Sequence, residues 1–93
     1  MNTSIEFRRQ RAEAEAAKLV AALPANIHPI LNRLPFGPRW ALAGTVNELR
    51  TKGNRDVYLR GIAICQTSAA LERDEISQAE FEVLALYIGN LPD

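Results

Sequence analysis

The sequence has few of the residues that build covalent, metal or catalytic sites. Its 93 residues include one cysteine, Cys65, and one histidine, His28. A lone cysteine excludes an internal disulfide and a cysteine-based zinc or iron–sulfur centre. We therefore expect the protein to reside in a reducing compartment. Glycine-rich nucleotide-binding loops and histidine-based zinc motifs are missing as well. We therefore expect no metal and no cofactor.

Catalytic groups are equally scarce. His28 and Cys65 could in principle form an imidazole–thiol pair. We instead expect Cys65 to lie buried on an apolar helix face, where a free cysteine behaves as a small hydrophobic side chain. Neighbouring carboxylates stand one or two positions apart, which places them on different faces of a helix. We predict no catalytic residues, and the protein is not expected to be an enzyme.

Long hydrophobic runs are also lacking. No stretch approaches the roughly 20 apolar residues that a membrane span needs. No apolar segment follows the first basic residues, as a secretory signal would require. We expect a cytoplasmic protein that does not contact membranes.

Alternating runs of β-branched and aromatic residues do not occur, which argues against strands. Alanine and leucine dominate the hydrophobic residues, which make up 47% of the chain. At 93 residues the chain has room for one core, and its connections are short. The expected fold class is all-α: one domain, residues 1–93, forming a compact four- to five-helix bundle.

Apolar spacing together with start and stop signals predicts the individual helices. The expected helices span about 4–23, 26–34, 38–52, 55–73 and 77–88. The first half of the first helix, about residues 4–15, is charged and alanine-rich, so we expect it to project into solvent. Asn26 and Asn54 are the expected caps of the second and fourth helices, and Gly53 is the expected stop of the third.

The fourth helix is the most apolar of the five and should be central. Its expected buried stripes contain Tyr58, Ile62, Cys65 and Ala69 on one side and Val57, Ile64 and Leu71 on the other. Gly61 lowers helix propensity within this segment, which indicates a close helix crossing.

The clearest local signal is the start of the last helix. Ser77 and Glu80 have the spacing of a capping box, in which each side chain bonds the backbone amide of the other residue. Ile76 and Phe81 are placed to pack together as a hydrophobic staple.

Charge is unevenly distributed although the net charge is zero. Residues 1–60 carry ten basic and five acidic side chains, whereas residues 61–93 carry one basic and six acidic side chains. This asymmetry predicts either a basic binding face or attraction between the two parts of one small bundle.

A turn between two prolines is the first candidate binding site. It combines Arg33, Phe36, Arg39 and Trp40. Tryptophan and arginine often carry binding energy at protein interfaces, so we predict a protein-binding site here. The structural alternative is that Phe36 and Trp40, four residues apart, pack together and close the bundle.

Basic residues form the second candidate site, for nucleic acid. They are Arg8, Arg9 and Arg11 on the first helix and Arg50, Lys52 and Arg55 around a turn. Each group is small, and the alternative is that these side chains are simply solvated and bind nothing.

The first helix also suggests a homodimer, through a seam with a four–three–four spacing formed by Ala12, Ala16, Leu19 and Leu23.

Taken together, these patterns predict a non-catalytic protein interaction module. Compact chains without metal, nucleotide or nucleophile motifs are common among accessory or inhibitory proteins of phages and mobile elements, and we expect this chain to be such a protein, acting on a host protein complex. The alternative function is a small regulatory nucleic-acid-binding protein that uses the basic first helix and the 50–55 turn.

Overall fold

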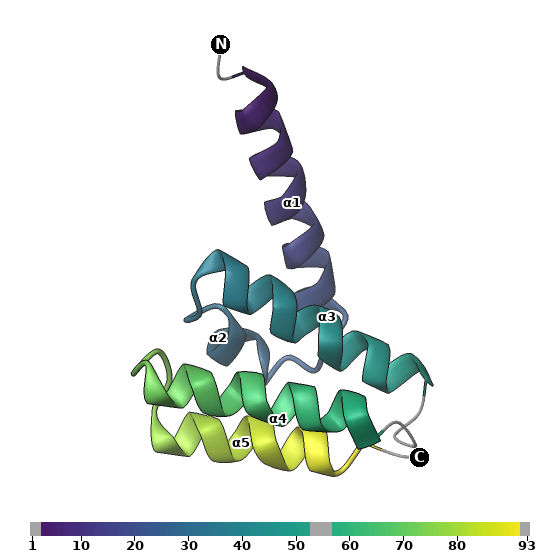
Figure 1. Ribbon diagram of the computed structural model, residues 1–93, viewed down its shortest axis with the longest axis vertical. Coiled ribbons are helices and arrows are strands. Elements are labelled where there is room, and N and C mark those ends of the chain that lie inside the picture. The colour runs from purple at the N-terminus through teal and green to yellow at the C-terminus, as the bar shows by residue number, and fades with distance from the viewer. Residues whose placement is uncertain (1–2, 53–56, 92–93) are drawn as a thin grey trace.

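The computed structural model describes residues 3–52 and 57–91, and these residues form an all-α fold without strands (Figure 1). The helices of the described residues are α1 (Thr3–Ala21), α2 (His28–Leu31), α3 (Phe36–Lys52), α4 (Val57–Glu72) and α5 (Gln78–Gly89). The predicted fold class is confirmed, and most predicted boundaries agree with the observed ones to within two residues. The predicted stop at Gly53 and cap at Asn54 lie outside the described residues.

The helices pack in chain order around a shared core. α1 packs against α3, α3 against α4, and α4 against α5. α4 therefore lies between α3 and α5, with the long axes of these two helices beside its own (Figure 1). The central position predicted for the fourth helix is confirmed.

Leucine and isoleucine side chains from α2, α3 and α5 fill the core. The largest fully buried aliphatic side chains are those of Ile27, Leu31, Leu42, Leu49, Leu84 and Ile88. Burying one such side chain stabilises a fold by about 1.5–3 kcal/mol. Since these residues come from segments far apart in the sequence, the core requires the whole bundle to assemble.

α2 buries the predicted apolar face but is only one turn long. Ile27, Ile30, Leu31 and Leu34 are all buried, as their spacing predicts. The prediction of Asn26 as the cap was wrong, because Ile27 holds the N-cap position with no side-chain hydrogen bond. The turn before α2 already satisfies the local donors, since the amide of Ile27 donates to the Pro24 carbonyl at 3.0 Å.

α4 is rotated relative to the prediction. Its buried residues are Ala63, Thr67 and Ala70, and the Thr67 hydroxyl donates to the Ala63 carbonyl at 2.8 Å. These three residues have small side chains and lie on one side of the helix, which lets neighbouring helices approach closely there. The predicted stripe with Tyr58 and Cys65 was therefore wrong, because both residues are exposed. On the other predicted stripe Ile64 and Leu71 do pack against the core, whereas Val57 is exposed.

The close helix crossing predicted at Gly61 was also wrong. Gly61 is exposed, and a Cβ added there would meet no atom within 4 Å. The glycine faces outward because the small residues that permit close packing, such as Ala63 and Ala70, occupy the other side of α4.

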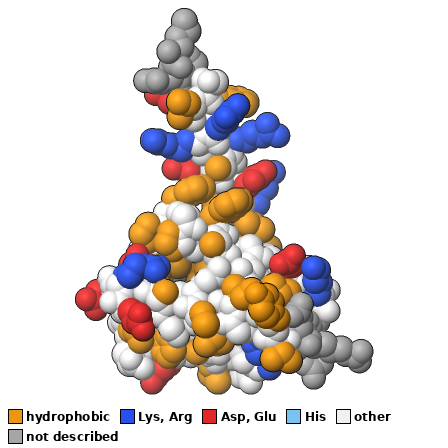
Figure 2. Space-filling model, viewed as in Figure 1, with side chains coloured by type: hydrophobic (Ala, Val, Ile, Leu, Met, Phe, Trp, Pro, Cys, Tyr) orange, Lys and Arg blue, Asp and Glu red, His pale blue; other side chains and the backbone are white. Residues whose placement is uncertain are grey.

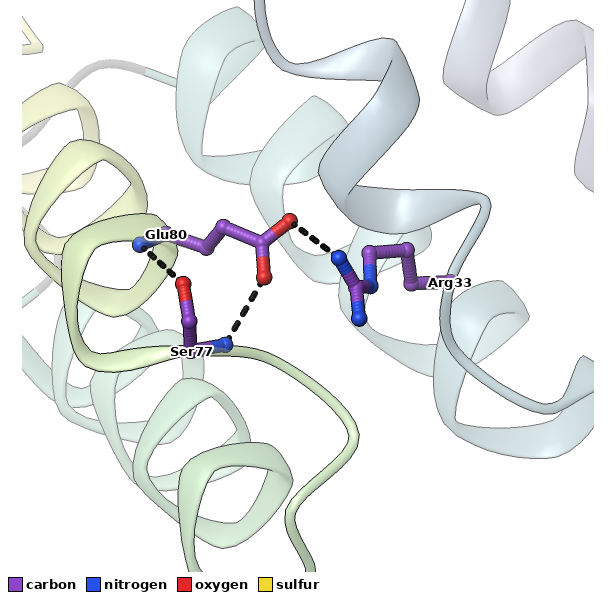
Figure 3. Close-up of polar contacts among 3 residues, drawn as sticks. All are labelled: Arg33, Ser77 and Glu80. Carbon is purple, nitrogen blue, oxygen red and sulfur yellow. Dashed lines mark hydrogen bonds and ion pairs between the residues drawn. The ribbon is translucent and has the colours of Figure 1, made fainter.

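The capping box at the start of α5 is confirmed (Figure 3). The Ser77 hydroxyl accepts from the Glu80 amide at 3.2 Å, and the Glu80 carboxylate accepts from the Ser77 amide at 2.7 Å. Ile76 is buried in the core, and Phe81 packs against that core. Local sequence therefore determines where α5 begins.

α1 has two dissimilar halves. Between residues 4 and 15 every side chain is exposed except the partly exposed Ala12, and this half extends away from the body (Figure 1). From Ala16 onward the helix packs on α3, where the Asn47 amide group donates to the Leu19 carbonyl at 2.8 Å. We call residues 4–15 the arm.

Candidate interaction surfaces

The aromatic pair of the predicted protein-binding site lies at the start of α3. The rings of Phe36 and Trp40 stack almost in parallel, with centroids 6.3 Å apart and planes 6° from each other. The packing alternative is correct in that the two rings contact each other. Trp40 nevertheless remains 47% exposed, so its ring also forms part of the surface.

The two arginines predicted beside these rings have acceptors within the chain. Arg33 donates to the Glu80 carboxylate at 3.3 Å, which joins the end of α2 to the capping box of α5 (Figure 3). Arg39 donates to the Leu34 carbonyl at 3.2 Å and so fastens α3 to the turn before it. Both guanidinium groups stabilise the arrangement of helices around the turn.

The Glu80 carboxylate is the electrostatic centre of this contact. The hydrogen bond from the Ser77 amide lowers the pKa of Glu80 most, and the charge of Arg33 lowers it further.

A second carboxylate, that of Glu75, has a similar environment just before α5. Arg73 donates two hydrogen bonds of 2.8 Å to the Glu75 carboxylate, and these lower the pKa of Glu75. Both carboxylates are therefore held in the charged form.

The outward face of α4 is an exposed apolar surface that sequence reasoning missed. An open hollow along it is lined by Val57, Tyr58, Gly61, Ile62, Cys65 and Gln66. Val57 and Tyr58 are each 79% exposed. Figure 2 shows hydrophobic side chains gathered where α4 begins. Both sides of α4 are apolar, so spacing alone could not reveal which one faces outward; the small size of Ala63 and Ala70 was the available signal.

Two further hollows extend this surface onto α3. One lies where α1 crosses α3 and includes Trp40, Ala41 and Gly44. The other lies between α3 and α4 and shares Ala41 with the first and Gln66 with the α4 hollow. We call the surface that contains these hollows the α3–α4 face; the members used below are Trp40, Ala41, Gly44, Val57, Tyr58, Gly61, Ile62, Cys65, Gln66 and Ala69. Polar residues line the two further hollows as well, namely Thr45, Asn47, Glu48, Thr51 and Arg73.

The basic residues predicted to bind nucleic acid fall into two separate groups. Arg8, Arg9 and Arg11 are exposed on the arm, whereas Arg50 and Lys52 lie at the far end of α3 (Figure 1). Arg50 donates to Asn47 at 3.1 Å, and Lys52 pairs with Glu48 at 3.3 Å. Arg55 lies outside the described residues. The described members therefore do not form one surface.

Most residues of the seam predicted for a homodimer pack against other parts of the same chain. Ala16 and Leu23 are buried, and Leu19 packs against the core. As an outward-facing surface the seam was therefore wrong, because α3 covers it from Ala16 onward. Ala12, on the arm, is partly exposed and has no core residue against it, whereas the partly exposed Leu19 packs against the core.

The imidazole and the thiol have separate environments. The His28 Nε2–H donates to the Leu23 carbonyl at 2.6 Å, which links α2 to the end of α1. Cys65 faces outward on α4, so its predicted burial was wrong. Within residues 3–52 and 57–91, no cluster of three or more histidine, cysteine or acidic residues is placed to hold a metal ion. None of the helices in these ranges is both long and apolar enough to cross a membrane.

Comparisons with known proteins give no relative. No protein-family model matches the chain, and neither the curated proteins nor the solved structures contain one that is significantly similar. The functional argument therefore depends on the geometry of these surfaces.

Proposed function

We propose that this protein is a non-catalytic protein-binding module that binds its partner through the α3–α4 face. The observation that carries the proposal is the exposure of Val57 and Tyr58, 79% each, beside an apolar hollow on the central helix. Contiguous apolar surface on a small domain is a mark of an interaction site.

The shape of the face favours a macromolecular partner. Its hollows are open and run along two neighbouring helices, whereas small-molecule sites are concave and enclose most of their ligand. The face also contains residues with no side chain or a very small one, namely Ala41, Gly44 and Gly61. Because little protrudes at these positions, a helix or ridge of a partner can approach the backbone closely. Trp40 and Tyr58 are of the residue types that most often anchor protein interfaces.

Such a module acts by occupying a surface of a larger assembly. Accessory or inhibitory action on a host protein complex, as in proteins of phages and mobile elements, is the form of this function that we propose. It requires only complementary surfaces and no reacting group on this chain.

The test is retention of a partner from a nuclease-treated lysate of the native host by the tagged protein and by two variants. Tyr58→Glu places a charge on the α3–α4 face, and we expect it to abolish retention of a stoichiometric partner. Phe7→Glu is the matched control, because Phe7 is a similarly exposed aromatic residue on the arm. Far-UV circular dichroism should show unchanged helix content in both variants, since both positions are exposed.

Equal retention by both variants would show that the α3–α4 face is not the binding surface. Retention that disappears with nuclease treatment would instead support the second candidate function, nucleic-acid binding. The observation that favours this candidate is that the side chains of Arg8, Arg9 and Arg11 are exposed and form no hydrogen bond or ion pair with the described residues. Binding of that kind should weaken steeply with added salt.

A further inference from the structure

The side of α4 that the chain leaves uncovered has the spacing of a coiled-coil interface. Tyr58, Ile62, Cys65 and Ala69 follow one another at intervals of four, three and four residues, as a and d positions do. We call these four residues the α4 stripe. Tyr58 and Cys65 are exposed, and Ile62 and Ala69 are partly exposed. The described residues that line the hollow beside them all belong to α4, so no described part of α3 or α5 overhangs it.

The α4 stripe contains no charged residue. Within residues 58–69 the one charged side chain is that of Arg60, which 3.6 residues per turn place on the opposite side of the helix. None of the described residues lining the α4 hollow is charged. Two charged side chains line the neighbouring hollows, and each has a partner: Glu48 pairs with Lys52, and Arg73 with Glu75. An apolar helix can therefore cover the stripe without burying an unpaired charge, which would be costly.

The side chains of the α4 stripe become smaller along the helix. Tyr58 and Ile62 in its first half are large, whereas Cys65 and Ala69 in its second half are small. In an antiparallel pair with a two-fold axis between residues 63 and 64, Tyr58 lies beside Ala69 of the second copy, and Ile62 beside its Cys65. Each layer then joins one large and one small side chain, as close packing requires.

A parallel pair of the same stripes would pack poorly. It would place Tyr58 against Tyr58 of the second copy in one layer and Ala69 against Ala69 in another. The first layer would be crowded and the other would leave a void, and both defects destabilise a packed interface. The order of sizes is therefore complementary to itself in the antiparallel direction alone.

We infer that the α4 stripe pairs antiparallel with the α4 stripe of a second copy of this chain. This pairing uses the α4 part of the α3–α4 face and so rests on the proposed function, for which it supplies a form of regulation: the partner has to displace the second copy. The paired segments are about 18 Å long at 1.5 Å per residue. So small an interface gives a dimer that dissociates on dilution.

Analytical ultracentrifugation across the micromolar to millimolar range tests this pairing. We expect the wild type to change from monomer to dimer within that range. Tyr58→Ala should raise the dissociation constant at least about tenfold, because it leaves a void in both outer layers. Phe7→Ala removes a similarly exposed ring from the arm and should leave the constant unchanged. Both side chains are exposed, so far-UV circular dichroism should show unchanged helix content in both variants.

Crosslinking of thiols reads the orientation of the pair. In the antiparallel register the two Cys65 residues are offset by about 4.5 Å along the helices, so a short bismaleimide should link them. Glu72→Cys in a Cys65→Ser background places the thiols about 25 Å apart in this register, and no link should form. A parallel pair would link efficiently at both positions. Labelling with a monofunctional maleimide controls for the reactivity of each thiol.

Four outcomes would overturn the inference: a monomer at all concentrations, equal dissociation constants for Tyr58→Ala and Phe7→Ala, a dimer without a Cys65 link, or efficient linking through Glu72→Cys. The proposed function is tested separately, by retention of a host partner at concentrations where the chain is monomeric. A dimer that crosslinks as expected, together with equal retention by Tyr58→Glu and Phe7→Glu, would support the pairing and overturn the proposed function.

Discussion

Gly61 occupies an exposed position on α4, and the point where a Cβ would lie is more than 4 Å from any atom that it could meet. Glycine in a helix costs about 1 kcal/mol relative to alanine because it loses more backbone entropy on folding. We therefore expect Gly61→Ala to stabilise the protein by up to about 1 kcal/mol, which raises the Tm by about 4–8 °C in a domain of this size.

Thermal denaturation followed by circular dichroism measures this change. Ala63→Gly is the matched control on the same helix, because Ala63 is fully buried and its loss should lower the Tm. If Gly61→Ala lowered the Tm instead, the glycine would be packed against another element, and the outward orientation of this side of α4 would be incorrect.

Single residues on the α3–α4 face also show why its exposure could not be seen in the sequence. Tyr58, Ile62 and Cys65 are spaced as a buried helical stripe would be. Tyr58 and Cys65 are nevertheless exposed and Ile62 is only half-buried. The reason is the opposite side of α4, where Ala63, Thr67 and Ala70 allow neighbouring helices to approach. Hydrophobicity alone ranks the bulkier side as the buried one, whereas close packing between α3 and α5 selects the side with small residues.

At the scale of one helix, the Ser77–Glu80 capping box determines how α5 begins. Ser77→Ala removes the acceptor for the Glu80 amide. Loss of an N-cap side chain costs about 1 kcal/mol, within a range of about 0.5–2 kcal/mol. We expect that decrease in the free energy of unfolding, measured by urea denaturation.

Ser68→Ala provides the control for this prediction. Ser68 lies within α4 and its side chain has no hydrogen bond in the described part of the chain. The same loss of a hydroxyl should therefore be neutral or slightly stabilising, since alanine has the higher helix propensity. Equal destabilisation by both substitutions would contradict a specific role for the cap.

Helices differ in how far their local sequence defines them. α5 carries a complete start signal and begins where the sequence predicts. α2 carries the right apolar spacing, but its cap is supplied by the backbone of the preceding turn, which local side chains do not encode. α1 is helical throughout, yet whether a turn is covered depends on the position of α3.

At the scale of the whole molecule, the basic part of the chain (residues 1–60) was predicted to attract the acidic part (residues 61–93). Among the described residues, one ion pair joins the two parts, that of Arg33 and Glu80. The pKa of Glu80 is lowered, first by the Ser77 amide and then by Arg33, and the pKa of Glu75 is lowered by Arg73. A carboxyl group with a lowered pKa in the folded state adds stability above its ordinary pKa of 4.5. That contribution is lost as the pH falls through the lowered value.

We therefore expect the free energy of unfolding to be level from neutral pH down to the ordinary carboxyl range and to decrease below it. Urea denaturation at a series of pH values measures this profile. Glu80→Gln should reduce the acid-dependent loss, because its neutral side chain cannot be protonated over this range. An identical pH profile for this variant would show that Glu80 does not contribute to the acid sensitivity.

The sequence by itself determined the all-α class, the order and approximate bounds of the helices, and the cap of α5, because these depend on propensity and on contacts within a few residues. The tertiary structure alone decided which side of α4 faces outward, which half of α1 is covered, and that Trp40, Ala41 and Tyr58 belong to one surface. The physical reason is that exposure depends on what the neighbouring helices cover, and residues such as Leu19 and Gly44 meet only after the chain has folded.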